Sequence, residues 1–181
     1  NLDNSIKKKI QTAVTIALIT AGIIPAAKAE VNDANVNNPS GTTIDQGLGT
    51  KAVDLDNGGT YTISNAGTIS AETSQNNVYG INVDSSTTIS QLTNSASGTI
   101  SAFTVSTSNR IGKGINGAGD SPITTLTNEG TISGRGRQRG GFGIQAVIGS
   151  FDNSGTIEGI SGDGIGGGVA ANTGIGVDFA E

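Results

Sequence analysis

The sequence contains no cysteine, histidine, methionine or tryptophan, and aromatic residues make up only 3% of its 181 residues. The absence of cysteine excludes a disulfide framework and thiolate metal sites. Without histidine, the Ser-His-Asp and Cys-His catalytic arrangements and every histidine-ligated metal site are also excluded. A core of large aromatic side chains cannot form, so the apolar contacts have to come mainly from isoleucine, valine, leucine and alanine.

The chain is instead rich in small and polar residues, with 29 glycines and only 14% charged residues. A polar, glycine-rich composition is typical of disordered segments. Here, however, β-branched residues recur at intervals along the chain, and such residues favour strands. We therefore expect the apolar side chains to be shared out along a regular stack rather than pooled in one globular centre.

The first 29 residues have the order of a secretory signal peptide. Three lysines at 7–9 precede an uncharged, mostly apolar run at 10–24, and small residues follow at 25–29. The apolar run is shorter than the ~20 residues that a membrane-spanning helix needs. We predict a helical signal peptide over residues 1–29, cleaved between Ala29 and Glu30; the alternative is an amphipathic or anchoring N-terminus. Because the first residue is not methionine, we expect the true start to be missing.

Removal of this segment changes the charge of the chain. Six basic and 14 acidic residues remain, a net charge of −8. An acidic chain is repelled by phosphate backbones, so nucleic acid is not an expected partner. The predicted location is outside the cytoplasm, at the cell surface or outer membrane or in the extracellular medium.

A short phrase, Asn-x-Gly-Thr-Ile, returns four times after residue 60, once with two extra residues inserted. Its asparagines are Asn65, Asn94, Asn128 and Asn153, and its glycines are Gly67, Gly98, Gly130 and Gly155. The glycines are 31, 32 and 25 residues apart, a spacing typical of a solenoid whose coils tolerate insertions.

Each repeat holds three short strand candidates bounded by glycine, asparagine or serine, which are turn residues. The sequence therefore predicts an all-β solenoid, a parallel β-helix with about three short strands per coil. We expect it over residues 46–181, truncated at its C-terminus, with residues 30–45 as a lead-in or N-terminal cap. Three interior rows are predicted: Ile69, Ile100, Ile132 and Ile157; Ile63, Leu92, Leu126 and Phe151; and Ile81, Ile115, Ile144 and Ile165.

The repeated asparagines fall between two strand candidates and suit a sharp corner, because asparagine tolerates the left-handed conformation and bonds locally. In a stack with ~4.8 Å between coils, their amides could also form a hydrogen-bonded ladder. The glycine of each phrase supplies either conformational freedom or room for a close approach. We interpret the phrase as a structural corner rather than a ligand site.

The phrase Asn-x-Gly-Thr-Ile-x-Gly/Ala, repeated behind a signal peptide in a cysteine-free chain, resembles autotransporter (type V secretion) passenger domains of Gram-negative bacteria over about residues 49–181. The resemblance implies a right-handed parallel β-helix, secretion through the outer membrane and a role in adhesion or autoaggregation. Implied partners are the outer-membrane translocation machinery or a C-terminal β-barrel, host or bacterial surface glycans, and other copies of the chain. That barrel is not in this sequence, so we expect either further sequence after Glu181 or another export route.

Few residues are candidates for chemistry. Two matches to G-x-G-x-x-G, at 112–117 and 162–167, are not followed by a predicted helix and do not predict a dinucleotide site. Asp54 to Gly58 departs from the EF-hand pattern and is better explained as an acidic turn. The carboxylates are scattered, and Glu129 and Glu158, near equivalent corners, form no evident pair. We assign no catalytic residue, cofactor or metal site.

The one basic cluster after the signal peptide is Arg135, Arg137 and Arg139, which alternate with glycine and glutamine. It is either a solvated loop or a contact for a polyanion such as a phosphorylated lipopolysaccharide or a glycosaminoglycan. The function predicted first is an adhesive or autoaggregating surface passenger. The alternatives are a structural stalk and a polysaccharide-active β-helix enzyme.

Overall fold

The computed structural model describes residues 30–46, 49–74, 76–106, 110–118, 123–137, 141–161 and 169–171. These residues form strands β1 to β16, and no helix long and apolar enough to cross a membrane occurs among them. The predicted signal peptide and its cleavage residue Ala29 lie outside the described residues. Glu30, the residue predicted to follow the cut, directly precedes β1.

The strands form three parallel sheets, here called sheets 1, 2 and 3 in the order in which the chain visits them. Sheet 1 contains β1 (Val31–Asn32), β4 (Lys51–Leu55), β7 (Val78–Val83), β10 (Gly112–Gly117), β13 (Phe142–Ala146) and β16 (Val169–Ala171). Sheet 2 contains β2 (Val36–Asn38), β5 (Gly59–Asn65), β8 (Thr87–Asn94), β11 (Ile123–Asn128) and β14 (Ile148–Asn153). Sheet 3 contains β3 (Thr43–Asp45), β6 (Thr68–Thr73), β9 (Thr99–Thr104), β12 (Thr131–Gly136) and β15 (Thr156–Ser161).

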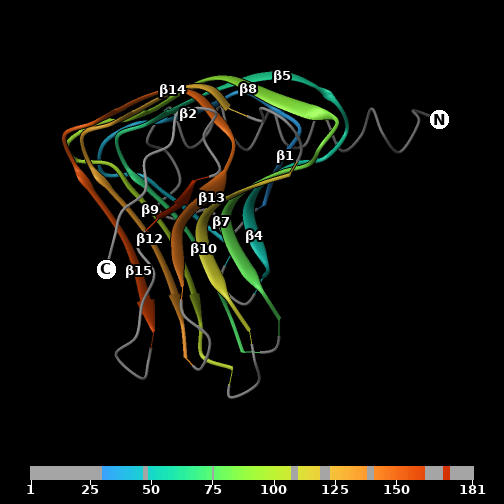
Figure 1. The fold of residues 1–181 in the computed structure, drawn as a ribbon, viewed down its shortest axis with the longest axis vertical. Helices are drawn as coiled ribbons and strands as arrows, with labels where there is room; N and C mark the ends of the chain where they lie inside the picture. Colours follow the sequence, from blue (N-terminus) through green and yellow to red (C-terminus); the bar gives the residue numbers. More distant parts are fainter. Residues whose placement is uncertain are drawn as a thin grey trace.

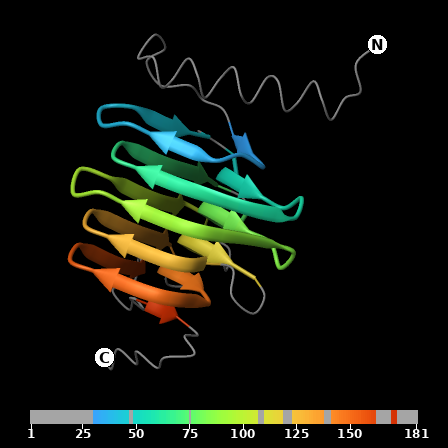
Figure 2. The same ribbon diagram turned by 90° about the horizontal axis from the view of Figure 1, so that it is seen from above.

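Each strand pairs in parallel with the strands three places before and after it, so one coil consists of one strand from each sheet. Figure 2 shows the coils stacked in sequence order, from β1 to β16. In Figure 1, sheet 2 lies across one end, while sheets 1 and 3 run away from it. The predicted parallel β-helix with three strands per coil is confirmed.

The interior rows lie in register from coil to coil, because the same residue of each repeat faces inward at the same place. Ile69 pairs with Ile100, and Ile132 pairs with both Ile100 and Ile157. The row through Ile63, Leu92, Leu126 and Phe151 is likewise in register. The side chains of Leu92 and Leu126 are fully buried, and burial of such a side chain contributes about 2–3 kcal/mol. These predicted rows are confirmed.

The third predicted row is correct through Ile81, Ile115 and Ile144 but wrong at its end. Ile144 pairs with Val169 of β16 rather than with Ile165, which lies outside the described residues. The turn between β15 and β16 is therefore longer than the repeat spacing suggested. Loop length varies between coils, so the position of a strand cannot be counted from the previous motif alone.

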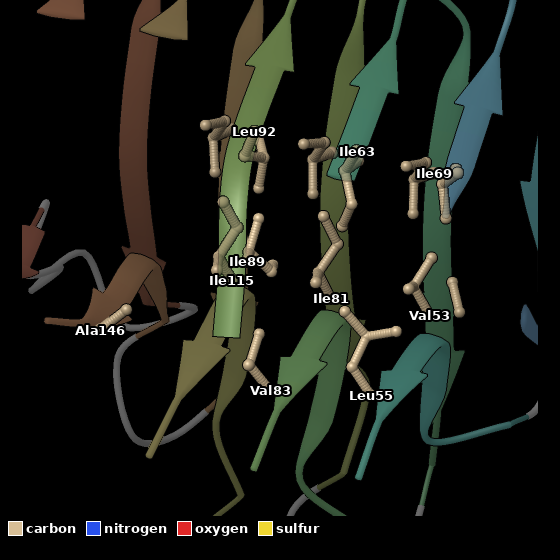
Figure 3. Packing of buried hydrophobic residues seen from close by; sticks show 14 of the residues in the cluster. Val53, Leu55, Ile63, Ile69, Ile81, Val83, Ile89, Leu92, Ile115 and Ala146 are labelled. Carbon is tan, nitrogen blue, oxygen red and sulfur yellow. The ribbon is translucent and has the colours of Figure 1, made fainter. Parts of the chain in front are cut away.

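Sheet 2 also carries a second interior row that the repeat pattern did not predict. It runs through Tyr61, Ile89, Ile123 and Ile148, which follow one another in register. Ile89 and Ile123 are completely buried. Figure 3 shows Ile89 close to Ile115 and Ile81 of sheet 1, inside the solenoid. The core is therefore one continuous apolar column with more than one side chain per strand.

Sheets 1 and 3 pack closely because sheet 1 has small residues where it faces sheet 3. Gly114 of β10 is an example, since a Cβ there would lie 2.9 Å from both Ile132 Cγ2 and the Ser133 backbone oxygen. Such a contact is too short for any side chain to be accommodated without a shift of the backbone. The two sheets can therefore form a narrow, dry layer.

Residues 30–45, predicted to be an irregular lead-in or cap, already form a complete coil. Strands β1, β2 and β3 each pair with the next strand of their sheet, at Val31–Val53, Val36–Ile63 and Ile44–Ile69. The predicted boundary at residue 46 is thus not where the solenoid begins. The coil was missed because its strands are only two or three residues long and its phrase, Asn38-Pro-Ser-Gly-Thr-Thr-Ile44, is interrupted.

Candidate functional site

The repeated asparagines form one column at the corner between sheets 2 and 3. The column consists of Asn38, Asn65, Asn94, Asn128 and Asn153. Each Nδ2 donates to the Oδ1 of the next asparagine at 2.7 or 2.8 Å. The first four side chains are at most 1% exposed, whereas Asn153 is exposed. The buried amides are therefore hydrogen-bonded to one another along the column, which ties neighbouring coils together at the corner.

The column has a direction, since every amide donates toward the C-terminal coil. At its N-terminal end, the Thr42 hydroxyl donates to Asn38 Oδ1 at 2.6 Å and satisfies the first acceptor. Beside the column, the corner glycines are needed for close approach and not for a left-handed conformation, because none of them has a positive φ. At Gly130, for example, a Cβ would lie 2.8 Å from Asn94 Nδ2 and still closer to two backbone oxygens.

A second polar column, which the sequence did not reveal, runs along the outer face of sheet 1. Asn116 Nδ2 donates to Asn82 Oδ1 at 2.7 Å, and Asn82 Nδ2 donates to Asp54 Oδ1 at 2.8 Å. Lys51 forms a salt bridge of 2.6 Å with the other Asp54 oxygen. Lys113 donates to Asn116 Oδ1 at 2.7 Å, and its Nζ lies 5.4 Å from the centre of the Tyr79 ring.

The two lysines of this column differ in their pKa. Burial lowers the pKa of Lys113, because no carboxylate offsets the loss of hydration. Burial acts on Lys51 in the same direction, but the hydrogen bond and charge of Asp54, with weaker contributions from Asp56 and Glu30, leave its pKa raised. Lys51 therefore stays protonated, and its positive charge is balanced by the carboxylate of Asp54.

The basic residues that follow the signal peptide gather at one edge of the solenoid, where the chain passes from sheet 3 back to sheet 1. This edge, called the basic edge below, holds Lys51, Arg110, Lys113, Arg135 and Arg137. Acidic residues are absent from 85–119 and from 130–151, which supply strands β9, β10, β12 and β13 of this edge. In the N-terminal coils this edge also carries the acidic residues Glu30, Asp45 and Glu72, whereas Asp33, Asp56 and Asp84 follow strands of sheet 1, at the opposite edge.

Two of the three predicted arginines line a hollow on this edge. The guanidinium carbon of Arg135 lies 5.0 Å from the centre of the Phe103 ring, on the neighbouring strand β9. The two residues are register partners, because both stand three positions after the isoleucine of the repeated phrase. Together with Val105 and Arg137 they line an open hollow of about 280 Å³. Arg139, the third predicted arginine, lies outside the described residues.

The other candidates are not brought together as a site. Residues 112–117 form strand β10, and the next element in the described part of the chain is strand β11 rather than a helix, so no helix N-terminus is placed there to hold a phosphate. The second match, at 162–167, lies outside the described residues. Glu129 lies at a corner, whereas Glu158 lies within β15 opposite Ser133. Among the residues with described positions, no group of three or more acidic side chains is placed to hold a metal ion.

Two contacts that were not predicted, Phe103 with Arg135 and Asn82 with Asn116, follow from an alignment of the repeats. Alignment of the repeats on Gly-Thr-Ile places Phe103 and Arg135 at the same offset and thereby predicts their contact. Alignment on the third strand of the repeat would likewise have placed Asn82 and Asn116 side by side. What spacing could not indicate is that basic residues from two different sheets share one edge.

The fold and its surface therefore define a class: a parallel β-helix with a buried asparagine column, an acidic overall charge and one basic edge. Comparisons with protein-family models, with curated proteins and with solved structures found no match for this chain.

Proposed function

We propose that this chain is an exported, non-enzymatic surface protein that adheres or self-associates through the side faces of its β-helix. The observation that carries the proposal is the clustering of positive charge: five basic residues share one edge of a chain whose net charge without residues 1–29 is −8. A local concentration of one sign of charge guides encounter with surfaces of the opposite sign. The signal-like residues 1–29 and the resemblance to autotransporter passengers support export to the cell surface.

The regular solenoid suits such a role for a physical reason. Its stability comes from residues that face inward and from the corner column, so the outer positions can vary without loss of the fold. Function is then carried by outer rows and by the loops between sheets 3 and 1. Translocation machinery of the outer membrane, or a barrel encoded downstream, would be the export partner.

Export and adhesion can be tested separately. The full chain is expressed in a Gram-negative host, and the exported form is expected to begin at Glu30 by N-terminal sequencing. Beads coated with the purified protein are expected to aggregate or to bind bacterial or host cell surfaces. An uncut N-terminus retained in the cytoplasm would contradict export, and inert beads would contradict adhesion.

A structural stalk is the second candidate, and the uninterrupted stacking of the coils in three parallel sheets favours it. A stalk predicts efficient export together with inert beads. A polysaccharide-active enzyme is the third candidate, and it predicts new chain ends when acidic polysaccharides are incubated with the protein.

A further inference from the structure

We propose that the hollow formed by Phe103, Val105, Arg135 and Arg137 binds an acidic polysaccharide through a carboxylated or sulfated sugar. The inference rests on the proposed adhesive function and names its ligand class. Two half-buried apolar side chains, Phe103 and Val105, and two exposed arginines line one hollow of about 280 Å³. A sugar ring has the matching chemistry, with an apolar face and, in acidic sugars, an anionic substituent at its edge.

The guanidinium group of Arg135 is oriented by its neighbours in a way that suits anion binding. Its guanidinium lies over the Phe103 ring at 5.0 Å, and a ring in this position limits the orientations of the planar group. On its other side the register partner of Arg135 is Ile160. Both neighbours in the sheet are therefore apolar, and the exposed fork of Arg135 remains available for bidentate contact with a carboxylate or sulfate.

The two arginines of the hollow have no carboxylate partner among the residues that the structure describes. Between residues of the described part of the chain, the only salt bridge is Lys51–Asp54, and neither Arg135 nor Arg137 contacts a carboxylate there. Glu72, the register partner of Phe103, limits the basic surface toward the N-terminal coils. Arg110 and Lys113 continue it on the adjacent part of the basic edge. An extended polyanion can thus contact the hollow and the neighbouring coil together.

Nucleic acid fits this surface less well. Duplex DNA carries one negative charge per ~1.7 Å of its axis. The acidic remainder of the chain would repel such a densely charged polymer. Single-stranded binding relies on several rings on which successive bases stack, whereas Phe103 is the one aromatic side chain that lines the hollow. A polyuronate such as polygalacturonate, with a single carboxylate on each ring, places fewer charges on the same surface.

The test measures binding of the full chain, at physiological salt, to immobilised heparin, polygalacturonate, neutral dextran and single-stranded oligothymidine. We expect saturable binding to heparin, polygalacturonate or both, and none to dextran; the comparison of the two distinguishes sulfate from carboxylate recognition. The double variant Arg135→Gln/Arg137→Gln is expected to bind at least tenfold more weakly. Arg135→Lys, which keeps the charge but not the fork, should lose severalfold.

Lys51→Gln is the matched control, because it also removes one positive charge from the same edge but at a lysine paired with Asp54. It is expected to change affinity less than twofold. Thermal unfolding followed by circular dichroism verifies that each variant remains folded. Equal losses for Lys51→Gln and Arg135→Gln, absence of polysaccharide binding by the wild-type chain, or equally tight oligothymidine binding would each overturn the proposal.

The same variants separate this inference from the proposed function. Beads coated with Arg135→Gln/Arg137→Gln protein that still adhere or aggregate would leave adhesion standing and refute the hollow as its site. Polysaccharide binding that depends on the two arginines, in a protein whose beads are inert, would support the hollow and refute adhesion.

Discussion

Replacement of Asn94 by alanine tests the central structural element, the buried asparagine column. Asn94 is completely buried and stands in the middle of the column. Its Oδ1 accepts from Asn65 at 2.8 Å, and its Nδ2 donates to Asn128 at 2.7 Å. The substitution therefore removes two hydrogen bonds between side chains and two longer ones, of 3.3 Å, from Asn94 Nδ2 to the Gly98 and Thr131 carbonyls. It leaves one buried acceptor, Asn128 Oδ1, without its donor.

The magnitude follows from these contacts. Each lost hydrogen bond reduces the free energy of unfolding by about 1 kcal/mol, and a buried group left unsatisfied costs a further ~1–3 kcal/mol. Asn65 Nδ2 keeps the Thr99 carbonyl as a partner at 3.2 Å, so its share is small. We expect Asn94→Ala to lower the free energy of unfolding by about 3–5 kcal/mol.

Asn153→Ala is the matched control, because Asn153 is exposed and water can replace its contacts. We expect it to cost no more than about 1 kcal/mol. Urea unfolding of the full chain, followed by circular dichroism, measures both values. Equal destabilisation by the two variants would refute the view that burial gives the column its strength. Asn94→Asp should be more stable at acidic than at neutral pH, because only the protonated carboxyl can donate to Asn128.

Four further predictions use the same unfolding assay. Leu126→Ala, at a fully buried position, is expected to cost about 2–5 kcal/mol; a loss below 1 kcal/mol would contradict the continuous core. Gly130→Ala should cost about 1–3 kcal/mol through overpacking against the Asn94 amide and nearby carbonyls, and an unchanged stability would show that the corner can open. The lowered pKa of Lys113 predicts that the wild type gains stability relative to Lys113→Met as pH rises from neutral toward 10.5, since the unfolded chain binds the extra proton. The raised pKa of Lys51 predicts the opposite sign: stability relative to Lys51→Met is retained below pH 10.5 and lost above it.

The positively charged residues of the basic edge differ in whether a carboxylate pairs with them. Lys51 is neutralised by Asp54 in its own coil, whereas Arg135 and Arg137 border a hollow without a nearby carboxylate among the described residues. Charges on the same edge are therefore not equivalent. Net charge predicts how the protein behaves in solution, but only local pairing indicates which residues remain free to bind.

The sequence by itself determined the repeating part of this protein. A short phrase that returns with Asn65, Asn94, Asn128 and Asn153 predicts both the corner and its ladder, because identical residues in stacked coils must meet identical residues. The same logic predicts the inward isoleucines and leucines. It failed where the repeat is interrupted, at residues 30–45 and between β15 and β16, because loop lengths carry no periodic signal.

Only the tertiary structure decided what the non-repeating residues do. Arg135 and Arg137 are a sequence cluster, but their contact with Phe103 and Val105 depends on the register between β9 and β12. The basic edge likewise joins Lys113, on β10 of sheet 1, and Arg135, on β12 of sheet 3. Such neighbours are far apart in the chain and are brought together by coil closure. A single repeat motif therefore predicts a scaffold, whereas the binding surface depends on which coil, edge and register each irregular residue occupies.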